Sequence, residues 1–400
     1  MKTILLSWRY LWSRPLAASL NLLLLTLGLT AITFVILASH QISRAFERDL
    51  AGIDLVVGAK GSPMQLILSG VFHIDAPTGN IPLAVVKALE ANPQVGKLIP
   101  LSLGDNFRGF RIVGTSLSYV SHYGATLADG VLWAKPMQAV IGAQVAKQTG
   151  LRVGDNFAGS HGLGAGGESH GKAVYSVVGV LAASTSVLDR LILTGTESVW
   201  QVHESDTALD AEDQKILEEE REVTMALIQY KSPLAAVTFP RFVNATTEMQ
   251  AAAPALEITR LLSMLGVGTD LLKVLAGVLL LTAGLSVFIA LWSAVRERRA
   301  DLALLRMLGA PPRKIAGLLL CEAMWLALMA CSLGLLAGQG LMALTALAMQ
   351  LDKSIALGLF AWPAELFFVP LLALGVACAA SFLPAWEAYR VSVFELLQSR

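Results

Sequence analysis

The chain has 400 residues, of which 55% are apolar and only 15% are charged, and its mean hydropathy is +0.62. An average soluble domain carries about 25% charged residues, so this composition argues against a wholly soluble protein and against disorder. The formal net charge is zero, which argues against a basic nucleic-acid-binding protein. Three cysteines in the whole chain exclude a disulfide-rich scaffold.

Four apolar stretches are long enough to cross a bilayer, which requires about 20 mostly apolar residues in a helix. They cover residues 16–39, 274–295, 315–349 and 364–386. Basic residues precede the first stretch, as they would in a signal peptide. Its apolar core is longer than the roughly 7–15 residues of a signal sequence, so we expect an uncleaved anchor that follows an interfacial N-terminal helix.

Loop charges predict the orientation of these spans. Residues 1–15 carry three basic and no acidic side chains, and residues 296–314 carry six basic and two acidic ones. Residues 41–270 carry 17 basic and 23 acidic side chains. Because basic loops stay in the cytoplasm, we expect both termini and residues 296–314 to be cytoplasmic. Residues 41–271 would then be periplasmic, in a protein of the bacterial inner membrane.

The segment between the first two spans has mixed patterning, which predicts an α+β domain. The expected fold is therefore a membrane protein of four transmembrane helices, with a large α+β extracytoplasmic domain inserted between the first and second. Its three parts are residues 1–40, 41–271 and 272–400. Apolar spacing predicts strands at 54–57, 97–103, 107–114, 173–181, 188–193 and 224–230, and helices at 82–91, 139–149 and 255–272. The last helix should continue into the second span, and residues 160–170 and 204–222 should be loops.

Motifs for catalysis are missing from the sequence. It has no Walker A loop and no G-x-S-x-G, H-E-x-x-H or C-x-x-C motif, so no nucleotide site, hydrolase or redox centre is expected in this chain. His161 and His170 flank a glycine-rich stretch and would suit a weak Zn²⁺ or Cu²⁺ site, or would be ordinary solvated loop histidines.

Two features of the third span allow more than one interpretation. Glu322 is a carboxylate in an apolar helix, which would suit an ion carrier or, more simply, a structural contact near the cytoplasmic interface. Gly334 and Gly338 form a G-x-x-x-G motif, which favours close helix packing or dimerisation.

The segment between the second and third spans carries a more specific pattern. Leu302, Leu305 and Leu308 form an apolar stripe, Gly309 suits a helix C-terminus, and Pro311 and Pro312 suit the start of the next helix. This pattern predicts a short rigid helix that docks into a groove of a soluble partner. The candidate coupling residues are Arg296, Glu297, Arg298, Arg299, Asp301, Leu302, Leu305, Arg306, Leu308 and Gly309.

The chain resembles the permease subunits of the MacB/LolCE/FtsX group of ABC transporters. The resemblance lies in residues 296–310, in the C-terminal stretches 383–390 and 393–397, and in the layout of one span, a large domain and three further spans. Trp386 and Glu387 depart from the basic residues that are more usual in that C-terminal signature.

The resemblance implies a non-catalytic permease that works as a dimer, as a homodimer or with a paralogous permease. A separate cytoplasmic ABC ATPase would bind ATP and Mg²⁺, and a periplasmic adaptor or lipoprotein is a further potential partner. The expected function is to transmit ATP-driven motion to the periplasmic domain, for export or extraction of a hydrophobic, peptide or lipoprotein-like substrate. The alternative is a transmembrane regulator that controls a periplasmic partner without transport.

Overall fold

The computed structural model describes residues 3–162, 169–204, 217–218, 220–297, 304–351, 358 and 360–390. They form two compact units. The helical bundle comprises Met1–Gln41, Met264–Leu347 and Leu359–Arg400, and the α+β domain comprises Ile42–Ser263 and Ala348–Gly358. Two long helices, α2 (Pro15–Leu50) and α10 (Pro254–Glu297), contribute residues to both units.

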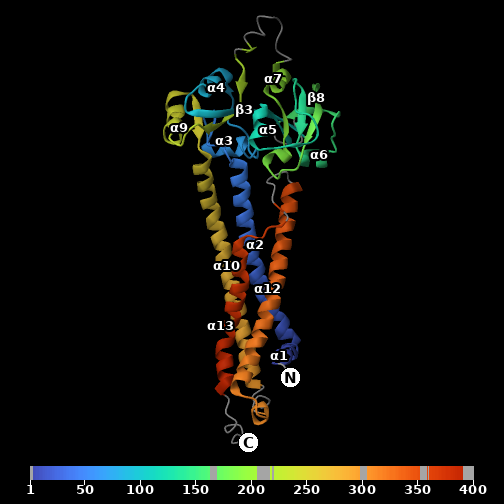
Figure 1. The fold of residues 1–400 in the computed structure, drawn as a ribbon, viewed down its shortest axis with the longest axis vertical. Coiled ribbons are helices and arrows are strands. Elements are labelled where there is room, and N and C mark those ends of the chain that lie inside the picture. The colour runs from blue at the N-terminus through green and yellow to red at the C-terminus, as the bar shows by residue number, and fades with distance from the viewer. Residues whose placement is uncertain are drawn as a thin grey trace. The chain divides into compact units, whose positions relative to one another are not determined.

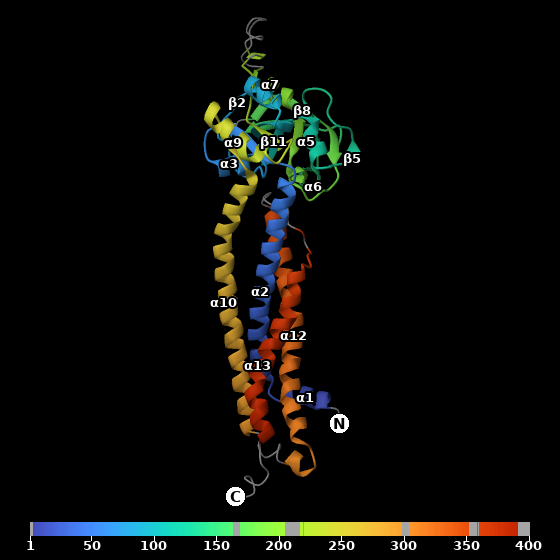
Figure 2. The ribbon, with the colours of Figure 1, turned by 60° about the vertical axis from the view of Figure 1, so that its left-hand side comes forward.

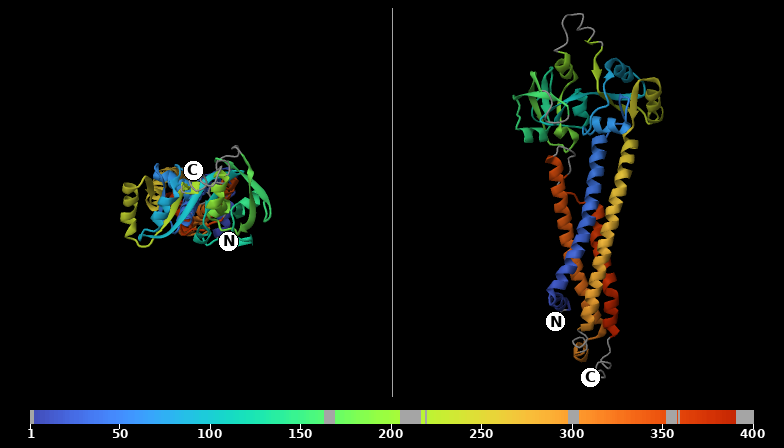
Figure 3. Two further views of the ribbon diagram at one scale, coloured as in Figure 1. Left: turned by 90° about the horizontal axis from the view of Figure 1, so that it is seen from above. Right: turned by 180° about the vertical axis from the view of Figure 1, so that it is seen from behind.

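Four helices among the described residues are long and apolar enough to span a membrane, which confirms the predicted number of spans. They are α2, α10, α12 (Pro312–Leu351) and the segment formed by η2 (Ala364–Phe367) with α13 (Phe368–Arg390). Within the bundle they run side by side (Figures 1 and 3). Helix α10 has 44 residues, about 66 Å at 1.5 Å per residue, and the hydrocarbon core is about 30 Å thick. The predicted continuation of the 255–272 helix into the second span is therefore confirmed.

Small residues bring the helices of the bundle close together. A Cβ added at Gly28 of α2 would lie 3.1 Å from the side chain of Leu280 on α10, and one at Gly284 would lie 3.1 Å from Val376 on α13. The N-terminal helix α1 (Thr3–Leu11) packs on α12 through Trp8, whose ring centroid lies 5.1 Å from that of Trp325. Packing of small residues is the usual way in which helices associate inside a bilayer.

A mixed sheet forms the centre of the α+β domain. Within the described residues it has ten strands in the order β12-β1-β11-β3-β4-β9-β6-β8-β5, and β7 pairs with β3 and β8. A separate two-stranded ladder joins β10 to β2. The strands are β1 (Leu55–Ala59), β2 (Ile81–Pro82), β3 (Val95–Phe107), β4 (Phe110–Thr115), β5 (Leu127–Gly130), β6 (Gln138–Ile141), β7 (Asn156–His161), β8 (Ser169–Leu181), β9 (Ile192–Gly195), β10 (Glu222–Val223), β11 (Met225–Tyr230) and β12 (Met249–Ala252).

Helices pack against the sheet in three apolar clusters, and Figure 2 shows α9 and α6 toward opposite sides of the domain. α4 (Leu83–Glu90) and α9 (Ala235–Thr246) pack on β1, β11 and β12, where Phe239 is fully buried. α6 (Ala143–Thr149) packs near the other end, on the side chains of β4, β6, β8 and β9. A third apolar cluster includes α3 (Pro63–Gly70), α5 (Leu117–His122) and η1 (Val187–Arg190), together with the ends of α2 and α10.

The structure corrects part of the sequence analysis. The predicted helix at 139–149 is wrong at its beginning, because residues 138–141 form strand β6 and the helix starts only after Gly142. Ala139, Val140 and Ile141 are fully buried in the sheet, and burial on both faces erases the alternation that marks a strand. The predicted strand at 188–193 is a 3₁₀ turn followed by the shorter strand β9.

Several short elements were missed by the sequence analysis. Except for the 12-residue α9, which contains Pro240, their polar–apolar patterns are too short to show a clear period. They include α3, α5, α9, β5, β7, β12 and α7 (Thr196–Glu204).

Candidate functional site

The two long helices are joined to neighbouring strands of the sheet. Four residues, 51–54, separate α2 from β1, and only Ala253 separates β12 from α10. β1 and β12 are antiparallel, and Val56 pairs with Ala252. The end of α2 and the start of α10 therefore lie at the same end of one strand pair.

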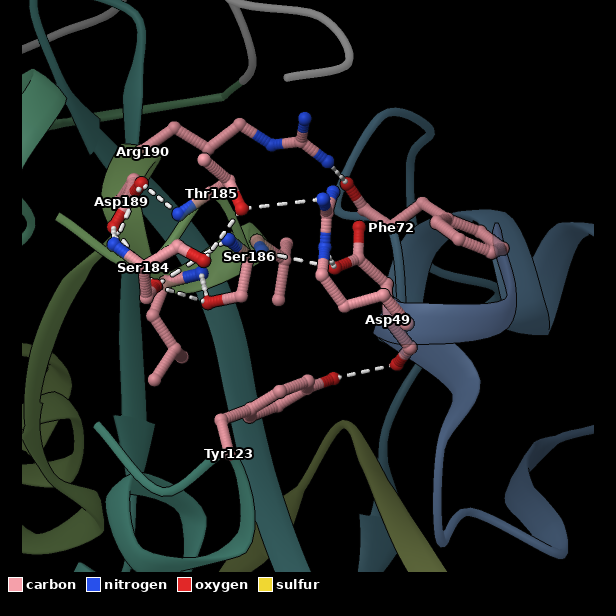
Figure 4. A network of polar contacts seen from close by, with 11 residues as sticks. Asp49, Phe72, Tyr123, Ser184, Thr185, Ser186, Asp189 and Arg190 are labelled. Atoms are coloured by element: carbon pink, nitrogen blue, oxygen red, sulfur yellow. Dashed lines mark hydrogen bonds and ion pairs between the residues drawn. The ribbon is translucent and has the colours of Figure 1, made fainter. Parts of the chain in front are cut away.

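A buried polar network, here called the α2 joint, holds the last turn of α2 (Figure 4). Asp49 is 2% exposed, and its Oδ1 accepts a hydrogen bond from the backbone N–H of Val187 at 3.2 Å and one from Arg48 Nε at 3.4 Å. The backbone carbonyl of Asp49 accepts a hydrogen bond from the Tyr123 hydroxyl at 2.8 Å. The helix end is therefore fixed to α5 and to η1 by bonds of defined direction.

The loop that receives Asp49 is held by a second carboxylate. Asp189 accepts hydrogen bonds from the backbone N–H groups of Ser184 (2.9 Å) and Thr185 (2.7 Å) and from the Ser184 hydroxyl (2.9 Å). Thr185 has a φ of 60°, which costs a non-glycine residue energy and is kept only where neighbours enforce it. Its Oγ1 accepts a hydrogen bond from Arg48 Nη1 at 3.3 Å. This loop is thus preformed to receive the end of α2.

Positive charge is buried beside the joint. Arg190 is 5% exposed and donates a hydrogen bond from Nη2 to the carbonyl of Phe72 at 2.7 Å. Burial lowers the pKa of Arg190, and the nearby Asp49 carboxylate opposes that shift. Arg111 hydrogen-bonds the carbonyl of Asp75, and burial lowers its pKa to about 10. Both guanidinium groups stay charged at neutral pH, and each has a compensating negative charge nearby, Asp49 for Arg190 and Asp75 for Arg111.

Apolar contacts hold the first turns of α10. Ile258 is 5% exposed within the cluster that also contains Phe46 of α2, and Leu261 and Leu262 pack against that cluster. The charged pair Arg260–Glu257 (3.0 Å) is an i,i+3 contact within α10 itself. Within the described residues, α10 therefore meets the α+β domain through packing, which has little directional preference.

The sequence analysis did not find the α2 joint. Its residues come from three separate places in the chain, around positions 49, 123 and 187, and no local spacing connects them. The one available signal was the charged pair Arg48–Asp49 near the end of a long apolar helix.

The predicted coupling segment is described in part. Arg296 lies over the ring of Trp292, 5.6 Å from its centroid, at the end of α10. Glu297 accepts a hydrogen bond from Ser293 Oγ at 3.1 Å and forms an ion pair with Arg14. Arg298, Arg299, Asp301 and Leu302 lie outside the described residues.

The end of this segment has the geometry that the sequence predicted. Residues 304–307 are helical, and Gly309 has a φ of 91°. The backbone N–H of Ala310 donates to the Leu305 carbonyl, and that of Gly309 donates to the Arg306 carbonyl, both at 3.0 Å. This is a Schellman cap, and α12 then begins at Pro312. Leu305 is half-buried, and the exposed apolar side chains here are Leu304, Met307 and Leu308.

Gly334 and Gly338 pack against α2 of the same chain. A Cβ at Gly334 would lie 2.7 Å from Leu29 Cβ, and one at Gly338 would lie 2.5 Å from Thr33 Cγ2. The structure therefore places this motif at a helix contact inside the bundle.

Glu322 lies in α12 and is 7% exposed. It lines a cavity of about 300 Å³ together with Arg14, Asn21 and side chains of α1 and α10. Asn21 Oδ1 accepts a hydrogen bond from Ser286 Oγ at 2.6 Å across the same cavity. The carboxylate thus faces protein, as expected for a charged residue in a membrane helix.

The two histidines considered for metal binding lie on paired strands. His161 of β7 contacts Asp105, with Nδ1 3.1 Å from Oδ1. His170 belongs to β8, and its side chain is outside the description. In the part of the chain that the structure describes, no group of three or more His, Cys, Asp or Glu residues is arranged to hold a metal ion.

Comparison with known proteins connects both units to one family. A family model described as the MacB-like periplasmic core domain matches residues 18–236, more than half of the chain. A second, described as the FtsX-like permease C-terminal domain, matches residues 273–393. No curated protein matches the sequence.

Two solved structures are similar to the domain between the spans. One is the periplasmic region of MacB from Actinobacillus actinomycetemcomitans, with 11% identity and a TM-score of 0.34, covering 53% of this chain and 95% of that one. The other is the extracellular domain of the noncanonic ABC-type transporter YknZ from Gram-positive bacteria, with 11% identity and a TM-score of 0.31, covering 50% and 98%.

The two family matches, the four spans and the mixed-sheet domain between the first two spans agree with one another. They describe a non-catalytic membrane subunit with a periplasmic domain, and membership of the family implies an ABC ATPase as partner. The chain belongs to the MacB/FtsX-type permeases of ABC transporters.

Proposed function

We propose that this permease transmits the ATP-driven motion of a separate cytoplasmic ATPase to its α+β domain, for export or extraction of a hydrophobic, peptide or lipoprotein-like substrate. The observation that carries the proposal is the attachment of two continuous long helices, α2 and α10, to the adjacent strands β1 and β12. A helix resists compression and bending over tens of ångströms, so a displacement at one end reaches the sheet at the other. In this scheme ATP and Mg²⁺ bind to the partner ATPase.

The ATPase would dock on the segment 296–314. Leu304, Met307 and Leu308 are exposed on a short helix whose end is fixed by the Gly309 cap, which suits insertion into an apolar groove. Deleting residues 298–308 should abolish co-purification with the ATPase. A milder variant, Leu308→Glu, should weaken co-purification, while Val237→Glu, at an exposed position of α9 outside the spans, should not. Full ATPase binding by the deletion variant would contradict this docking site.

A second copy of the chain would pack along α10. Seven exposed apolar side chains follow one another at spacings of three and four residues, the pattern of a coiled-coil seam. The first three precede the membrane span, where exposure of apolar side chains to water is unfavourable. The seam consists of Met264, Val267, Leu271, Val274, Val278, Leu281 and Leu285.

The oligomeric state tests this seam. Leu271→Glu should shift the full-length protein in detergent toward the monomer, measured by mass photometry. Leu272→Glu changes an exposed neighbour outside the seam and should leave the dimer intact. Equal dimer fractions for the two variants would rule out the seam.

The proposed orientation places both termini and residues 296–314 in the cytoplasm and residues 41–271 in the periplasm. The test uses a chain without its native cysteines that carries a single new cysteine, either Glu218→Cys or Arg306→Cys. The two variants should differ in their labelling by a membrane-impermeant maleimide on intact cells. Only the first should be labelled. Labelling of both from one side would overturn the topology and the proposed transmission.

A further inference from the structure

Two histidines lie against the α2 joint, and each has a ring nitrogen that is buried without a hydrogen-bond partner among the described residues. His73 is 6% exposed, and its Nε2 lies 3.0 Å from the Tyr119 hydroxyl, while Nδ1 has no partner. His73 also has a φ of 53°, so its backbone is held in a conformation that few non-glycine residues adopt. A buried polar atom left unpaired is costly, which calls for an explanation.

The second histidine touches the chain directly after α2. The ring of His122 hydrogen-bonds the backbone of Ala51, and its Nε2 is buried without a partner in the described part of the chain. The ring packs so closely on Gly52 that a Cβ there would lie 2.9 Å from Cε1. His122 is also 5.0 Å, centroid to centroid, from the ring of Tyr123.

A chain of contacts connects His73 to the end of α2. Tyr119 and Tyr123 hydrogen-bond through their side chains, with ring centroids 5.3 Å apart. The Tyr123 hydroxyl donates to the Asp49 carbonyl at 2.8 Å. Both histidines therefore border on groups that hold α2, one through Tyr119 and Tyr123 and the other directly.

We propose that the α2 joint is acid-sensitive: protonation of His73 or His122 opens the joint and uncouples α2 from the α+β domain when the compartment around that domain becomes acidic. A protonated His73 would be a further buried cation near Arg111 and Arg190. A protonated His122 would place a charge on a nitrogen that is sealed from water. Opening of the joint exposes both rings to solvent and removes these penalties.

The direction of the effect follows from the charges and burial around each ring. Burial and the positive charges of Arg111 and Arg190 hold the pKa of His73 well below its ordinary value. Burial and the charge of Lys97 lower the pKa of His122, against an opposing hydrogen bond with the backbone of Ala51. The titratable and charged groups around the two rings are Arg48 and Asp49 on α2, Asp75 after α3, Lys97 on β3, Arg111 on β4, Tyr119 and Tyr123 around α5, and Arg190 on η1.

The closed joint therefore disfavours the protonated form of both histidines, whereas in the open joint their pKa values return toward the ordinary value of about 6.5. Above that pH the joint has its full stability. Below it the open form binds the extra protons, and the ratio of closed to open joints falls, by at most about tenfold per pH unit for each histidine.

Hydrogen exchange of the full-length protein in detergent, without ATPase or nucleotide, measures this opening. Exchange at residues 46–54 and 184–190, corrected for the intrinsic pH dependence of exchange, should show opening that increases at least tenfold between pH 6.5 and pH 5.5. His73→Gln and His122→Gln should each reduce that increase, and the double variant should abolish it. Glutamine keeps a polar group toward the former partner but cannot take up a proton.

Two controls separate acid sensing from general loosening. Tyr123→Phe removes one hydrogen bond of the joint and should raise opening at every pH while the pH dependence stays. His161→Gln changes a half-exposed histidine on β7 and should leave the exchange at the joint unchanged.

Opening that does not change with pH in the wild type overturns the proposal, and so does an unchanged pH dependence in the double variant. If one variant fails to fold, the other one carries the test. Because no ATPase is present, the result is independent of whether the joint transmits motion as proposed above.

Discussion

The end of α2 and the start of α10 share one apolar cluster of the α+β domain, but among the described residues only α2 is also held there by directed hydrogen bonds. In the bundle both helices have close contacts, α2 with Gly334 and Gly338 of α12, and α10 with Gly28 of α2. Hydrogen bonds fix both distance and direction, whereas apolar packing tolerates small shifts in register and rotation. We infer that α2 acts as the rigid element of the pair and that α10 is free to adjust.

The largest expected loss of stability is at the α2 joint. Asp49→Ala removes the acceptor of the Val187 N–H group and leaves Arg190 without its nearby negative charge. The expected loss of stability is about 3 kcal/mol, measured as thermal unfolding of the full-length protein in detergent. Asp129→Ala, at an exposed position of β5, is the matched control and should change stability by less than about 0.5 kcal/mol. Similar values for the two variants would remove the distinction between α2 and α10.

The next effect tests the packing of α2 in the bundle. Gly338→Ala places a Cβ 2.5 Å from Thr33 Cγ2 and 2.6 Å from Thr33 Cβ, so the two helices must separate. We expect the free energy of unfolding to fall by about 2 kcal/mol, measured by the same thermal unfolding. Gly340→Ala is two residues away and meets nothing within 4 Å. Gly340→Ala should be neutral or stabilising by up to about 1 kcal/mol. An equal loss of stability in Gly340→Ala and Gly338→Ala would contradict the close contact between Gly338 and Thr33.

A smaller effect is expected at the start of α10. Ile258→Val removes one methyl group from the apolar cluster and should cost about 1 kcal/mol. Hydrogen exchange at residues 46–54 should stay close to that of the wild type, because the hydrogen bonds of the α2 joint remain even though Phe46 shares this cluster. Faster exchange there would show that the two helices are not held separately.

The smallest effect is expected at the charged pair on α10. Arg260→Ala removes an exposed i,i+3 contact with Glu257, and such pairs contribute about 0.3–0.5 kcal/mol. The free energy of unfolding should fall by less than it does in Ile258→Val. The difference between Arg260→Ala and the wild type should shrink further in high salt. A loss of several kcal/mol would mean that polar contacts also anchor α10.

The sequence predicts those parts of the molecule that depend on local pattern. About 20 consecutive apolar residues define a span, and the order Gly309, Pro311, Pro312 specifies the cap and the next helix, as the structure confirms. Strand β6 was mistaken for helix because Ala139, Val140 and Ile141 are buried on both faces and show no alternation. The α2 joint was missed for another reason, since Asp49 and Val187 meet only after the whole sheet is assembled.

The order of the sheet has a consequence for the size of any displacement. Both membrane helices attach at one margin, through β12 and β1, and β5 lies seven inter-strand steps beyond β1. At about 4.8 Å per step, the far margin is up to about 34 Å away, less where the sheet twists. If the sheet turns as one body about this margin, a turn of about 10° at β1 displaces β5 by about 6 Å, which is more than the length of a hydrogen bond.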